Sequence, residues 1–538
     1  MTATGPRPDP RVHARRWAIL GVLSLSLVII GLDNTVLNVA LPTLQRTFGA
    51  TASELQWMVD AYVLVFAGLL LVMGALGDRF GRAKALQAGL VIFAASSVAA
   101  TFATDAVHVI AARVAMGVGG ALIMPSTLSI IANVFPRAER PKAITVWAGV
   151  SGLGVGLGPL IGGLLIANFD WSAVFLINVP IALTALLLGI FLVPESRDPA
   201  SPPLDLPGAI LSIGAVVAFV YAVIEAPGTG WTDPLILVTF GAAIVLGAAF
   251  AWRETHTTHP MLDLALFRDR HFTAGAFAIA LTFFALFAVI FGLTQYLQFV
   301  LGKTALEAGA LMVTLAVGIP VGARISLKAV GHAGTKRVIA VALVVVGAIL
   351  LTITRWTPTT ETWVVSLTLF FLAVALANIM APATSSVMTA VPEAKAGVGS
   401  AMNDLLRQLG GALGVAIIGS VMNTVYRDRM VDVVAALPAQ AAALAGDSVG
   451  AAVAIAARVG GPAGEALAAA ARGSFVDALG VAAVVAAGVT FATAVFVART
   501  MPSTTAVEDA AAAGALLTAP GTGRCTGPRG SRPLRWRS

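Results

Sequence analysis

Hydrophobic residues follow one another along this chain in long runs that short polar segments separate. A helix that crosses a bilayer needs about 20 mostly apolar residues, and open strands would leave backbone groups unpaired in lipid. Twelve runs contain no charged residue or a single arginine, and two more contain one aspartate each. The fourteen predicted spans are residues 17–39, 55–76, 86–104, 114–136, 143–169, 171–194, 206–224, 234–252, 272–302, 308–323, 338–354, 362–392, 405–426 and 478–498.

Basic residues lie mostly on one side of this predicted bundle. If the N-terminus is placed in the cytoplasm, 25 of the 34 Lys and Arg residues fall in cytoplasmic segments and seven fall outside. Such a bias sets the orientation of membrane proteins. We therefore expect both termini to be cytoplasmic and the number of spans to be even.

The predicted spans form a layout of six helices, two helices and six helices. Two six-helix halves with a central site between them are typical of secondary transporters. The expected segments are a cytoplasmic tail (1–16), a six-helix bundle (17–194), a linker (195–206), two additional helices (207–252), a second linker (253–271), a second six-helix bundle (272–499) with a long outside loop (427–474), and a disordered cytoplasmic tail (500–538).

Composition narrows the possible functions further. Only 11% of the residues are charged and the mean hydropathy is +0.90, which excludes a soluble protein of this size. The net charge of +7 reflects cytoplasmic loops beside anionic lipid, so we expect no nucleic-acid partner. The lone Cys525 allows neither an internal disulfide nor a cysteine-based metal site.

Two matches to enzyme motifs lack the context that their chemistry needs. Gly302-Lys303-Thr304 has Leu297 where a phosphate-binding loop requires glycine, and the segment 446–450 matches G-x-S-x-G with no strand before it. We therefore expect neither an ATP site nor an enzyme, and no cofactor or metal.

Several motifs carry a resemblance when they are taken in order. They are L-D-N-T-V-L-N-V-A-L-P (32–42), G-A-L-G-D-R-F-G-R-A-K (74–84), R-x-x-x-G (113–117), G-V-G-L-G-P-L-I-G-G (154–163), F-L-I-N-V-P (175–180) and R-Q-L-G-G-A-L-G-V-A (407–416). The chain resembles the major facilitator superfamily over about residues 17–499, and within it the fourteen-helix drug:proton antiporter branch of EmrB/QacA type. Ala83 departs from the basic residue of the loop motif. The resemblance implies an all-α integral membrane protein with two six-helix bundles and two extra central helices.

Three charged residues, two inside predicted spans and one directly before a span, are candidates for proton coupling. An unpaired carboxylate in hydrocarbon is costly, so Asp33 is a plausible reversible proton carrier, although a structural hydrogen bond would also explain it. Asp60 can be a second proton site, a contact for cationic drugs, or a hydrated group near the outside end. Arg113 cannot lose its proton and needs a partner, either as part of the coupling or in a static ion pair with Asp33 or Asp60.

Polar residues near these charges are candidates for binding the substrate. Asp60 lies one turn from Gln56 and Trp57, so the three are expected on one face of their helix. Near the end of the span 272–302, polar side chains can line a cavity or form an interfacial belt. The candidate substrate-binding residues are Asn34, Asn38, Trp57, Asp60, Gln295, Tyr296 and Gln298.

Gating residues are expected in three places. The glycines of the fifth span permit close packing and Pro159 bends it, and the resemblance implies that this motif limits leakage in exporters. The resemblance also implies that the charged loop after the second span joins the two halves, while Arg407 can reach back to Asn403 or Asp404. The candidates are Gly77, Asp78, Arg79, Gly81, Arg82, Gly154, Gly158, Pro159, Gly162, Gly163, Asn403, Asp404 and Arg407.

The expected function is proton-coupled antiport that exports amphipathic drugs, antibiotics or dyes by alternating access. Import of a small metabolite with protons and a non-transporting membrane sensor are the alternatives. The expected partners are protons, a small amphipathic molecule and the bilayer of a bacterial cytoplasmic membrane, with the protein as a monomer.

Overall fold

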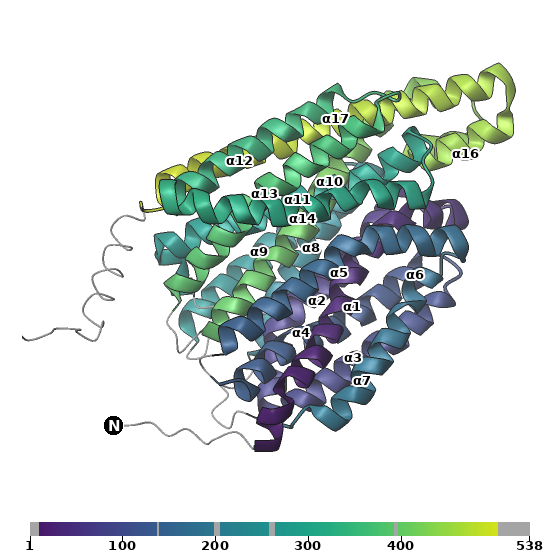
Figure 1. The fold of residues 1–538 in the computed structure, drawn as a ribbon. Helices are drawn as coiled ribbons and strands as arrows, with labels where there is room; N and C mark the ends of the chain where they lie inside the picture. The colour runs from purple at the N-terminus through teal and green to yellow at the C-terminus, as the bar shows by residue number, and fades with distance from the viewer. Residues whose placement is uncertain (1–9, 137–138, 198–204, 258–263, 392–395, 504–538) are drawn as a thin grey trace, which may run out of the picture.

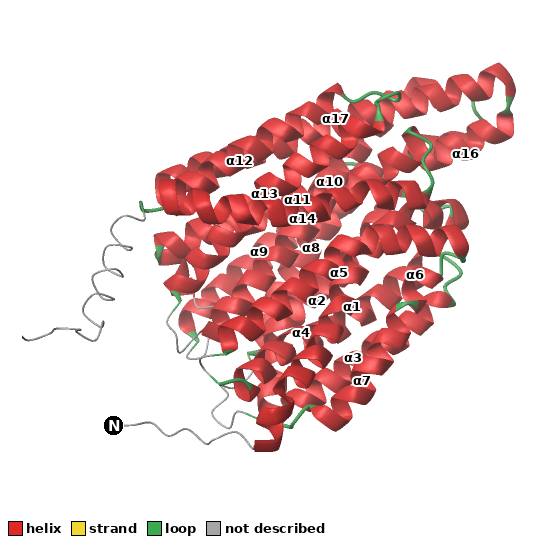
Figure 2. Cartoon of the chain, viewed as in Figure 1, coloured by secondary structure: helices red, strands yellow, loops and turns green. Residues whose placement is uncertain are grey.

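The computed structural model describes residues 10–136, 139–197, 205–257, 264–391 and 396–503, and the regular secondary structure within these ranges is helical (Figure 2). The first half comprises α1 (Pro10–Phe48), α2 (Ala52–Phe80), α3 (Arg82–Thr101), α4 (Ala106–Val134), α5 (Arg140–Asn168), α6 (Ala173–Leu176) and α7 (Asn178–Leu192). Two further helices follow, α8 (Leu206–Thr229) and α9 (Pro234–His256). The second half comprises η1 (Leu264–Arg268), α10 (Arg270–Gln295), the π-helical η2 (Tyr296–Val300), α11 (Ala305–Ala333), α12 (Thr335–Thr352), η3 (Ile353–Arg355), α13 (Thr362–Ala390), α14 (Ala396–Val434), α15 (Ala439–Asp447), α16 (Val449–Val459) and α17 (Gly461–Thr500).

The helices match the predicted spans closely. Thirteen helical segments within the described residues are long and apolar enough to cross a membrane. The remaining predicted span, 143–169, lies in α5, which is 29 residues long. The all-helical fold expected from the hydrophobic runs is therefore confirmed.

The two halves repeat one pattern of helix packing (Figure 1). In the first half α1 packs on α5, α2 on α4 and α3 on α7; in the second half α10 packs on α14, α11 on α13 and α12 on α17. The halves meet where α5 lies against α11 and where α14 lies against α2. The two seam contacts are related by the same repeat, because α2 meets α14 in the way that its equivalent α11 meets α5.

Local sequence signals repeat in the same way. Thr51 and Glu54 form a capping box at the start of α2, and Thr304 and Glu307 form one at the start of the equivalent α11. A capping box satisfies two backbone N–H groups that the first turn leaves free. Both helices end at a glycine with a positive φ, Gly81 at 130° and Gly334 at 76°, which a residue with a side chain rarely adopts. Each signal fixes one end of a helix that borders the seam.

Helix α8 lies along the seam on one side of the molecule. It packs against α2 of the first half and α14 of the second, and α9 packs mainly against α8. Hydrogen bonds fix this position, because Ser53 Oγ donates to Ile224 O at 3.2 Å and Ser420 Oγ donates to Val223 O at 2.5 Å. Helix α8 therefore bridges the two halves, and α9 is attached to the bundle mainly through α8.

The segment 427–474, expected as a long loop, is mostly helical. Helix α14 extends to Val434, α15 and α16 follow, and α17 begins at Gly461. Ser448 caps α16 by accepting a hydrogen bond from Ala451 N, and Gly460 and Gly461 turn the chain with φ values of 64° and 58°. Alanine has the highest helix propensity, so this alanine-rich stretch forms helices where the turn residues allow.

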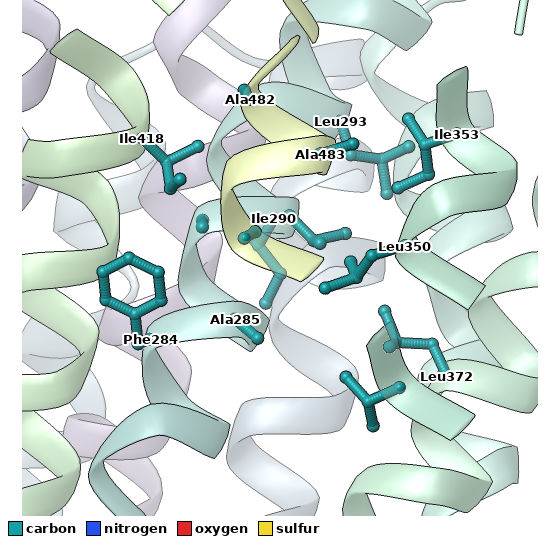
Figure 3. Close-up of a cluster of buried hydrophobic side chains, with 14 of the residues drawn as sticks. Phe284, Ala285, Ile290, Leu293, Leu350, Ile353, Leu372, Ile418, Ala482 and Ala483 are labelled. Atoms are coloured by element: carbon teal, nitrogen blue, oxygen red, sulfur yellow. The ribbon is translucent and has the colours of Figure 1, made fainter. Parts of the chain in front are cut away.

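The core of the second half consists of aliphatic and aromatic side chains with alanine between them (Figure 3). Ile290 and Leu293 of α10 face Leu350 of α12, and α17 contributes Ala482 and Ala483. Small residues let helices approach closely in a membrane, where dispersion contacts rather than exclusion of water hold helices together. The second half thus has a continuous apolar core of its own beside the seam.

Candidate functional site

A buried ion pair lies at the centre of the first half. Arg113 of α4 binds Asp33 of α1 through Nη1 and Oδ2, and the side chains are 1% and 3% exposed. The other carboxylate oxygen of Asp33 accepts a hydrogen bond of 3.1 Å from Asn178 Nδ2 at the start of α7. The structure therefore selects Asp33 rather than Asp60 as the partner of Arg113.

Arg113 has two further contacts, both with α2. Its Nε donates to Met58 O at 2.9 Å, and its guanidinium carbon lies 4.2 Å from the centre of the Tyr62 ring. The glycine one turn later makes this possible, because a Cβ at Gly117 would lie 2.7 Å from Tyr62 O. The R-x-x-x-G spacing thus brings α4 close enough to α2 for the arginine to reach a backbone carbonyl.

Asp60 lies on α2 in a different environment. Its side chain is fully buried, and neither carboxylate oxygen has a hydrogen-bond partner within the described part of the chain. A hydrated group near the end of a span, one of the alternatives for Asp60, is therefore not what the structure shows. It places a second acid in the interior of the first half, where none of the described residues bonds its carboxylate.

The residues expected on one face with Asp60 point to different helices. Trp57 Nε1 donates to Glu225 Oε1 of α8 at 2.9 Å, and its ring centre lies 6.1 Å from that of Tyr221. Gln56 Nε2 instead lies 3.5 Å from Val415 O of α14. Sequence reasoning missed Glu225, which follows directly after the predicted span 206–224.

Asn34 and Asn38 each donate to the backbone of their own helix. Asn34 Nδ2 bonds Ile30 O at 2.9 Å and Asn38 Nδ2 bonds Asn34 O at 3.0 Å. Their amide oxygens are buried without a partner among the described residues. Both side chains therefore retain an acceptor for a ligand.

The three candidates at the end of α10 separate in the structure. Gln295 lines a cavity between the halves and its Nε2 lies 3.4 Å from Phe291 O. The Tyr296 hydroxyl donates to Thr357 O at 2.7 Å and its ring stacks on Trp356, away from that cavity. Gln298 Nε2 donates to Val39 O of α1 at 2.9 Å and so joins the halves.

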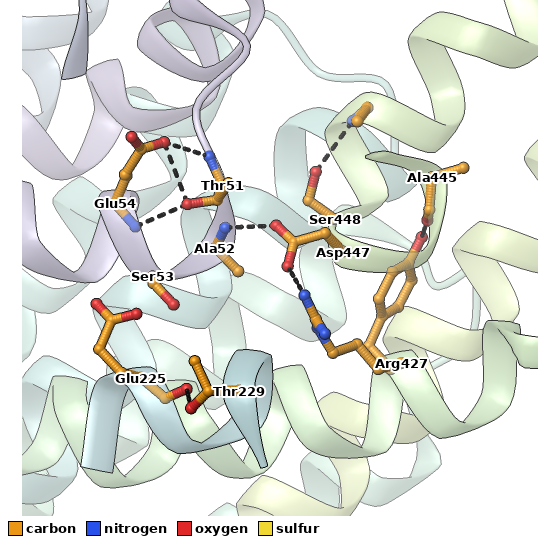
Figure 4. A network of polar contacts seen from close by, with 12 residues as sticks. Thr51, Ala52, Ser53, Glu54, Glu225, Thr229, Arg427, Ala445, Asp447 and Ser448 are labelled. Atoms are coloured by element: carbon orange, nitrogen blue, oxygen red, sulfur yellow. Dashed lines mark hydrogen bonds and ion pairs between the residues drawn. The ribbon is translucent and has the colours of Figure 1, made fainter. Parts of the chain in front are cut away.

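Contacts between the halves gather at the end of the bundle where α1 ends and α2 begins, which we term the closed end. Besides the Gln298 bond, the Arg46 guanidinium lies 5.0 Å from the centre of the Phe299 ring. Ala52 N donates to Asp447 Oδ2 at 2.9 Å (Figure 4). These contacts draw α1 and α2 against the second half.

The glycine motif of α5 has two packing faces. Gly154, Gly158 and Gly162 face α1, where a Cβ at Gly154 or Gly162 would lie 3.0 Å from a backbone oxygen. Pro159 and Gly163 face α11, and a Cβ at Gly163 would lie 2.8 Å from Leu306 Cα. One face therefore joins α5 to the helix that bears Asp33, and the other forms the seam.

The charged motif expected as a loop forms the last turn of α2 and the first turn of α3, with Gly81 between them, and it lies against the segment that follows α7 in the same half. Asp78 and Arg82 form an ion pair at 2.6 Å, Arg82 N donates to Ser196 O at 3.0 Å, and Ala83 N lies 3.3 Å from Glu195 Oε1. Gly77 lies close to Ala85 and Ser126, while the Arg79 guanidinium lies 5.7 Å from the Phe80 ring. Sequence reasoning missed Glu195, and a Cβ at Gly81 would collide with its carboxylate.

The polar residues of α14 form a cluster in the second half. In the amide orientation that satisfies both neighbours of Asn403, its nitrogen donates to Thr384 Oγ1 at 3.2 Å and its oxygen accepts from Arg407 Nη2 at 3.1 Å. The Arg407 guanidinium lies 5.4 Å from the centre of the Phe283 ring. Asp404 is buried beside them, at 8% exposure.

Comparison with known proteins agrees with this architecture. The profile of the Major Facilitator Superfamily matches residues 23–415. The chain is 37% identical over 496 residues to the multidrug efflux pump LfrA of Mycolicibacterium smegmatis, covering 92% of this chain and 98% of that protein. It is 32% identical over 416 residues to the tetracenomycin C resistance and export protein of Streptomyces glaucescens, covering 77% of each.

Solved structures share the fold at low sequence identity. A bacterial homolog to the human lysosomal transporter Spinster, in an inward-facing and occupied conformation, aligns with a TM-score of 0.62 and 18% identity over 92% of this chain and 98% of that one. A D-xylose-proton symporter aligns with a TM-score of 0.59 and 15% identity over 91% and 99%. The family profile, the relatives and the repeated six-helix packing lead to one conclusion. The chain belongs to the Major Facilitator Superfamily of transporters.

Proposed function

We propose that this protein exports amphipathic drugs, antibiotics or dyes in exchange for protons, by alternating access across a bacterial cytoplasmic membrane. The buried Asp33–Arg113 pair carries the proposal. The names of the relatives support the substrate class, since LfrA is a multidrug efflux pump and another relative is an export protein.

The ion pair suits a proton exchanged in one step of a cycle. A proton on Asp33 removes the charge that holds Arg113, and Arg113 keeps only Met58 O and the Tyr62 ring as partners. Because breaking a buried pair leaves one charge uncompensated, the two protonation states favour different helix arrangements. Proton binding at Asp33 therefore shifts the balance between conformations.

Close packing connects the ion pair to the seam. The neighbours of Asp33 on α1, Leu32 and Thr35, contact Gly158 of α5. The next residue, Pro159, contacts Gly309 of α11 in the other half. A movement of α1 after proton binding is therefore transmitted to the contact between the halves.

Asp60 is a second acid that can take part in the exchange. A charged carboxylate without a partner is costly in this interior, so the site favours either a proton or the cationic group of a substrate. With the positive side in the cytoplasm, the closed end faces outward. We infer from the contacts at this end that the described conformation is closed toward the outside.

Transport in proteoliposomes tests the proposal. Wild-type protein under a proton gradient should transport ethidium in the direction opposite to the proton flux. The rate of ethidium transport by Asp33→Asn should be less than about 1% of the wild-type rate, because the group that couples the two fluxes is lost. The matched control is Asp105→Asn, which replaces an exposed carboxylate that caps α4 by another good cap.

Two outcomes separate the alternatives. Ethidium moving together with protons indicates import, and proton-independent binding without transport indicates a sensor. Full proton-driven exchange by Asp33→Asn contradicts the role of Asp33.

A further inference from the structure

An asparagine of α7 takes part in the Asp33–Arg113 site. The buried residues of α7 are Asn178, Ala182, Ala185 and Gly189, which lie three or four positions apart and therefore share one face of the helix. Helix α7 packs on α1 and α3. Because the alanines and the glycine carry no polar group, Asn178 is the residue through which this face of α7 bonds the carboxylate of Asp33.

The amide of Asn178 has one group in use and one that lacks a partner. The side chain is fully buried, and its Nδ2 donates to Asp33 Oδ1 at 3.1 Å. Its Oδ1 is buried without a partner among the described residues. Buried polar atoms in proteins are normally hydrogen-bonded, and a charged carboxylate offers no proton to such an oxygen. The free acceptor therefore lies beside an acid that can donate to it only after binding a proton.

Two other buried asparagines bond differently. Asn38 Nδ2 donates at 3.0 Å, and Asn378 Nδ2 at 2.8 Å, to the carbonyl four residues earlier in the same helix. Asn178 instead donates to a side chain of α1 that lies 145 positions away in the sequence. Its contact is therefore a tertiary one, directed at the acid to which the proposed function assigns the proton.

Protonation of Asp33 reverses the hydrogen bond that Asn178 can make. A proton on Asp33 Oδ1 forms one O–H bond and turns this atom from an acceptor into a donor. A half turn of the amide about its last side-chain bond, a torsion with two broad preferences, brings Asn178 Oδ1 to the place of Nδ2. One hydrogen bond then replaces another, and no covalent bond of Asn178 breaks.

The other groups around Asp33 cannot take this part. Arg113 of α4 binds the opposite carboxylate oxygen, Oδ2, and has only donors. Tyr62 of α2 lies with its ring against the Arg113 guanidinium, and α5 presents Gly154 and Gly158 to this part of α1. The amide of Asn178 can both donate and accept, so it suits both states of the acid.

We propose that Asn178 is a positioning residue for the proton exchange, because its amide donates to Asp33 while the acid is charged and accepts from Asp33 once the acid carries the proton. The inference rests on the proposed export function and deepens it. The proton ends the ion pair between α1 and α4 but leaves α1 bonded to α7. Helix α1 is therefore released from α4 alone.

Infrared difference spectra of the purified full-length protein test this role. Spectra at acidic minus alkaline pH contain the C=O stretching bands of protonated carboxyl groups, and the band that Asp33→Asn removes belongs to Asp33. In Asn178→Leu this band should move to higher wavenumber, because leucine has nearly the same size and accepts no hydrogen bond. The matched control, Asn378→Leu, removes a buried amide that bonds its own helix and should leave the band in place.

Binding and transport give a second readout. Calorimetry with tetraphenylphosphonium at alkaline pH should show an affinity within about twofold of wild type in Asn178→Leu, because Arg113 still holds the charged acid. Ethidium–proton exchange should fall about tenfold, because the protonated acid loses its acceptor.

Three results overturn the proposal. They are an unmoved Asp33 band in Asn178→Leu, an equal shift in Asn378→Leu, and a wild-type band at the wavenumber of a carboxyl without any hydrogen bond, which needs no Asn178 variant to fold. Failure of the export proposal is distinguishable, because the wild type then shows no ethidium–proton exchange.

Discussion

Each half of the molecule carries an arginine within a helix long enough to cross a membrane, Arg113 in α4 and Arg407 in α14, and the two are held differently. Arg113 is 1% exposed and binds a carboxylate, a backbone carbonyl and an aromatic face. Arg407 is only partly buried and binds the neutral amide of Asn403, with Phe283 and the buried Asp404 beside it but no ion pair between the described side chains. A proton that binds Asp33 removes the charge opposite Arg113. The amide of Asn403 carries no charge that a proton could remove from beside Arg407. In the proposed function, this contrast favours the first half as the place of proton coupling.

The largest expected effect comes from removing Arg113. Arg113→Met leaves the Asp33 charge buried without its partner, which should lower the free energy of unfolding by about 3–5 kcal/mol. Arg407→Met, the matched change in the second half, should cost about 1 kcal/mol, since it removes a hydrogen bond to a neutral group. Urea unfolding in detergent, followed by tryptophan fluorescence, measures both.

The double variant sharpens this comparison. Adding Asp33→Asn to Arg113→Met removes the uncompensated charge, so most of the lost stability should return while proton-coupled transport stays absent. Equal losses in Arg113→Met and Arg407→Met contradict the distinction between the halves.

An intermediate effect is expected at the seam. In Gly163→Ala the added Cβ would lie 2.8 Å from Leu306 Cα, which should cost about 1–3 kcal/mol in the closed arrangement. Cysteine replacements of Val39 and Gln298, on a Cys525→Ser background, place one thiol in each half at the closed end. The rate at which the two thiols form a disulfide measures how often this end is closed. That rate should fall at least about fivefold in Gly163→Ala.

The control for the seam is Gly488→Ala on α17, where a Cβ meets nothing within 4 Å. It should leave the rate of disulfide formation unchanged. An unchanged rate in Gly163→Ala as well shows that α5 and α11 do not determine closure.

The smallest effect is expected at the start of α8. Burial raises the pKa of Asp205. Hydrogen bonds from Arg253 and Gly208 N, together with the charge of Arg253, lower the pKa by more than burial raises it, so the pKa lies below its ordinary value of 3.8. A lowered pKa stabilises the fold above the ordinary value, and this stability is lost as the pH falls through the folded pKa. Asp205→Asn should lower stability by about 1 kcal/mol at neutral pH, because the 35% exposed Arg253 is partly screened.

The pH dependence checks the assignment. The difference in unfolding midpoint between wild type and Asp205→Asn should be constant from about pH 5 to pH 8 and shrink below about pH 4. A difference that grows on acidification contradicts this account of Asp205.

Much of the fold was predictable because each span is a local pattern. A run of about 20 apolar residues must become a helix in lipid, and T-x-x-E and glycine fix where α2 and α11 begin and end. The charges were also evident from sequence, since Asp33, Asp60 and Arg113 interrupt apolar runs. The choice of Asp33 as partner required the geometry of four helices.

The remaining contacts depend on tertiary packing that no local pattern encodes. Asn178 reaches Asp33 from α7, and the carbonyl of Met58 has no side-chain signal at all. Glu225 and Asp447 lie outside the predicted spans, and their contacts appear only when α8 and α15 are placed against α2. Sequence alone therefore identified the charges but not the groups that hold them.

The central claim is that Asp33 exchanges a proton when substrate binds. Its most direct test is the pH change on adding tetraphenylphosphonium to weakly buffered, purified protein, followed with an indicator dye. Starting from protein that carries the proton, wild type and Asp105→Asn should release about one proton per bound cation, while Asp33→Asn should bind the cation and release none. Equal proton release by Asp33→Asn and wild type would contradict the account.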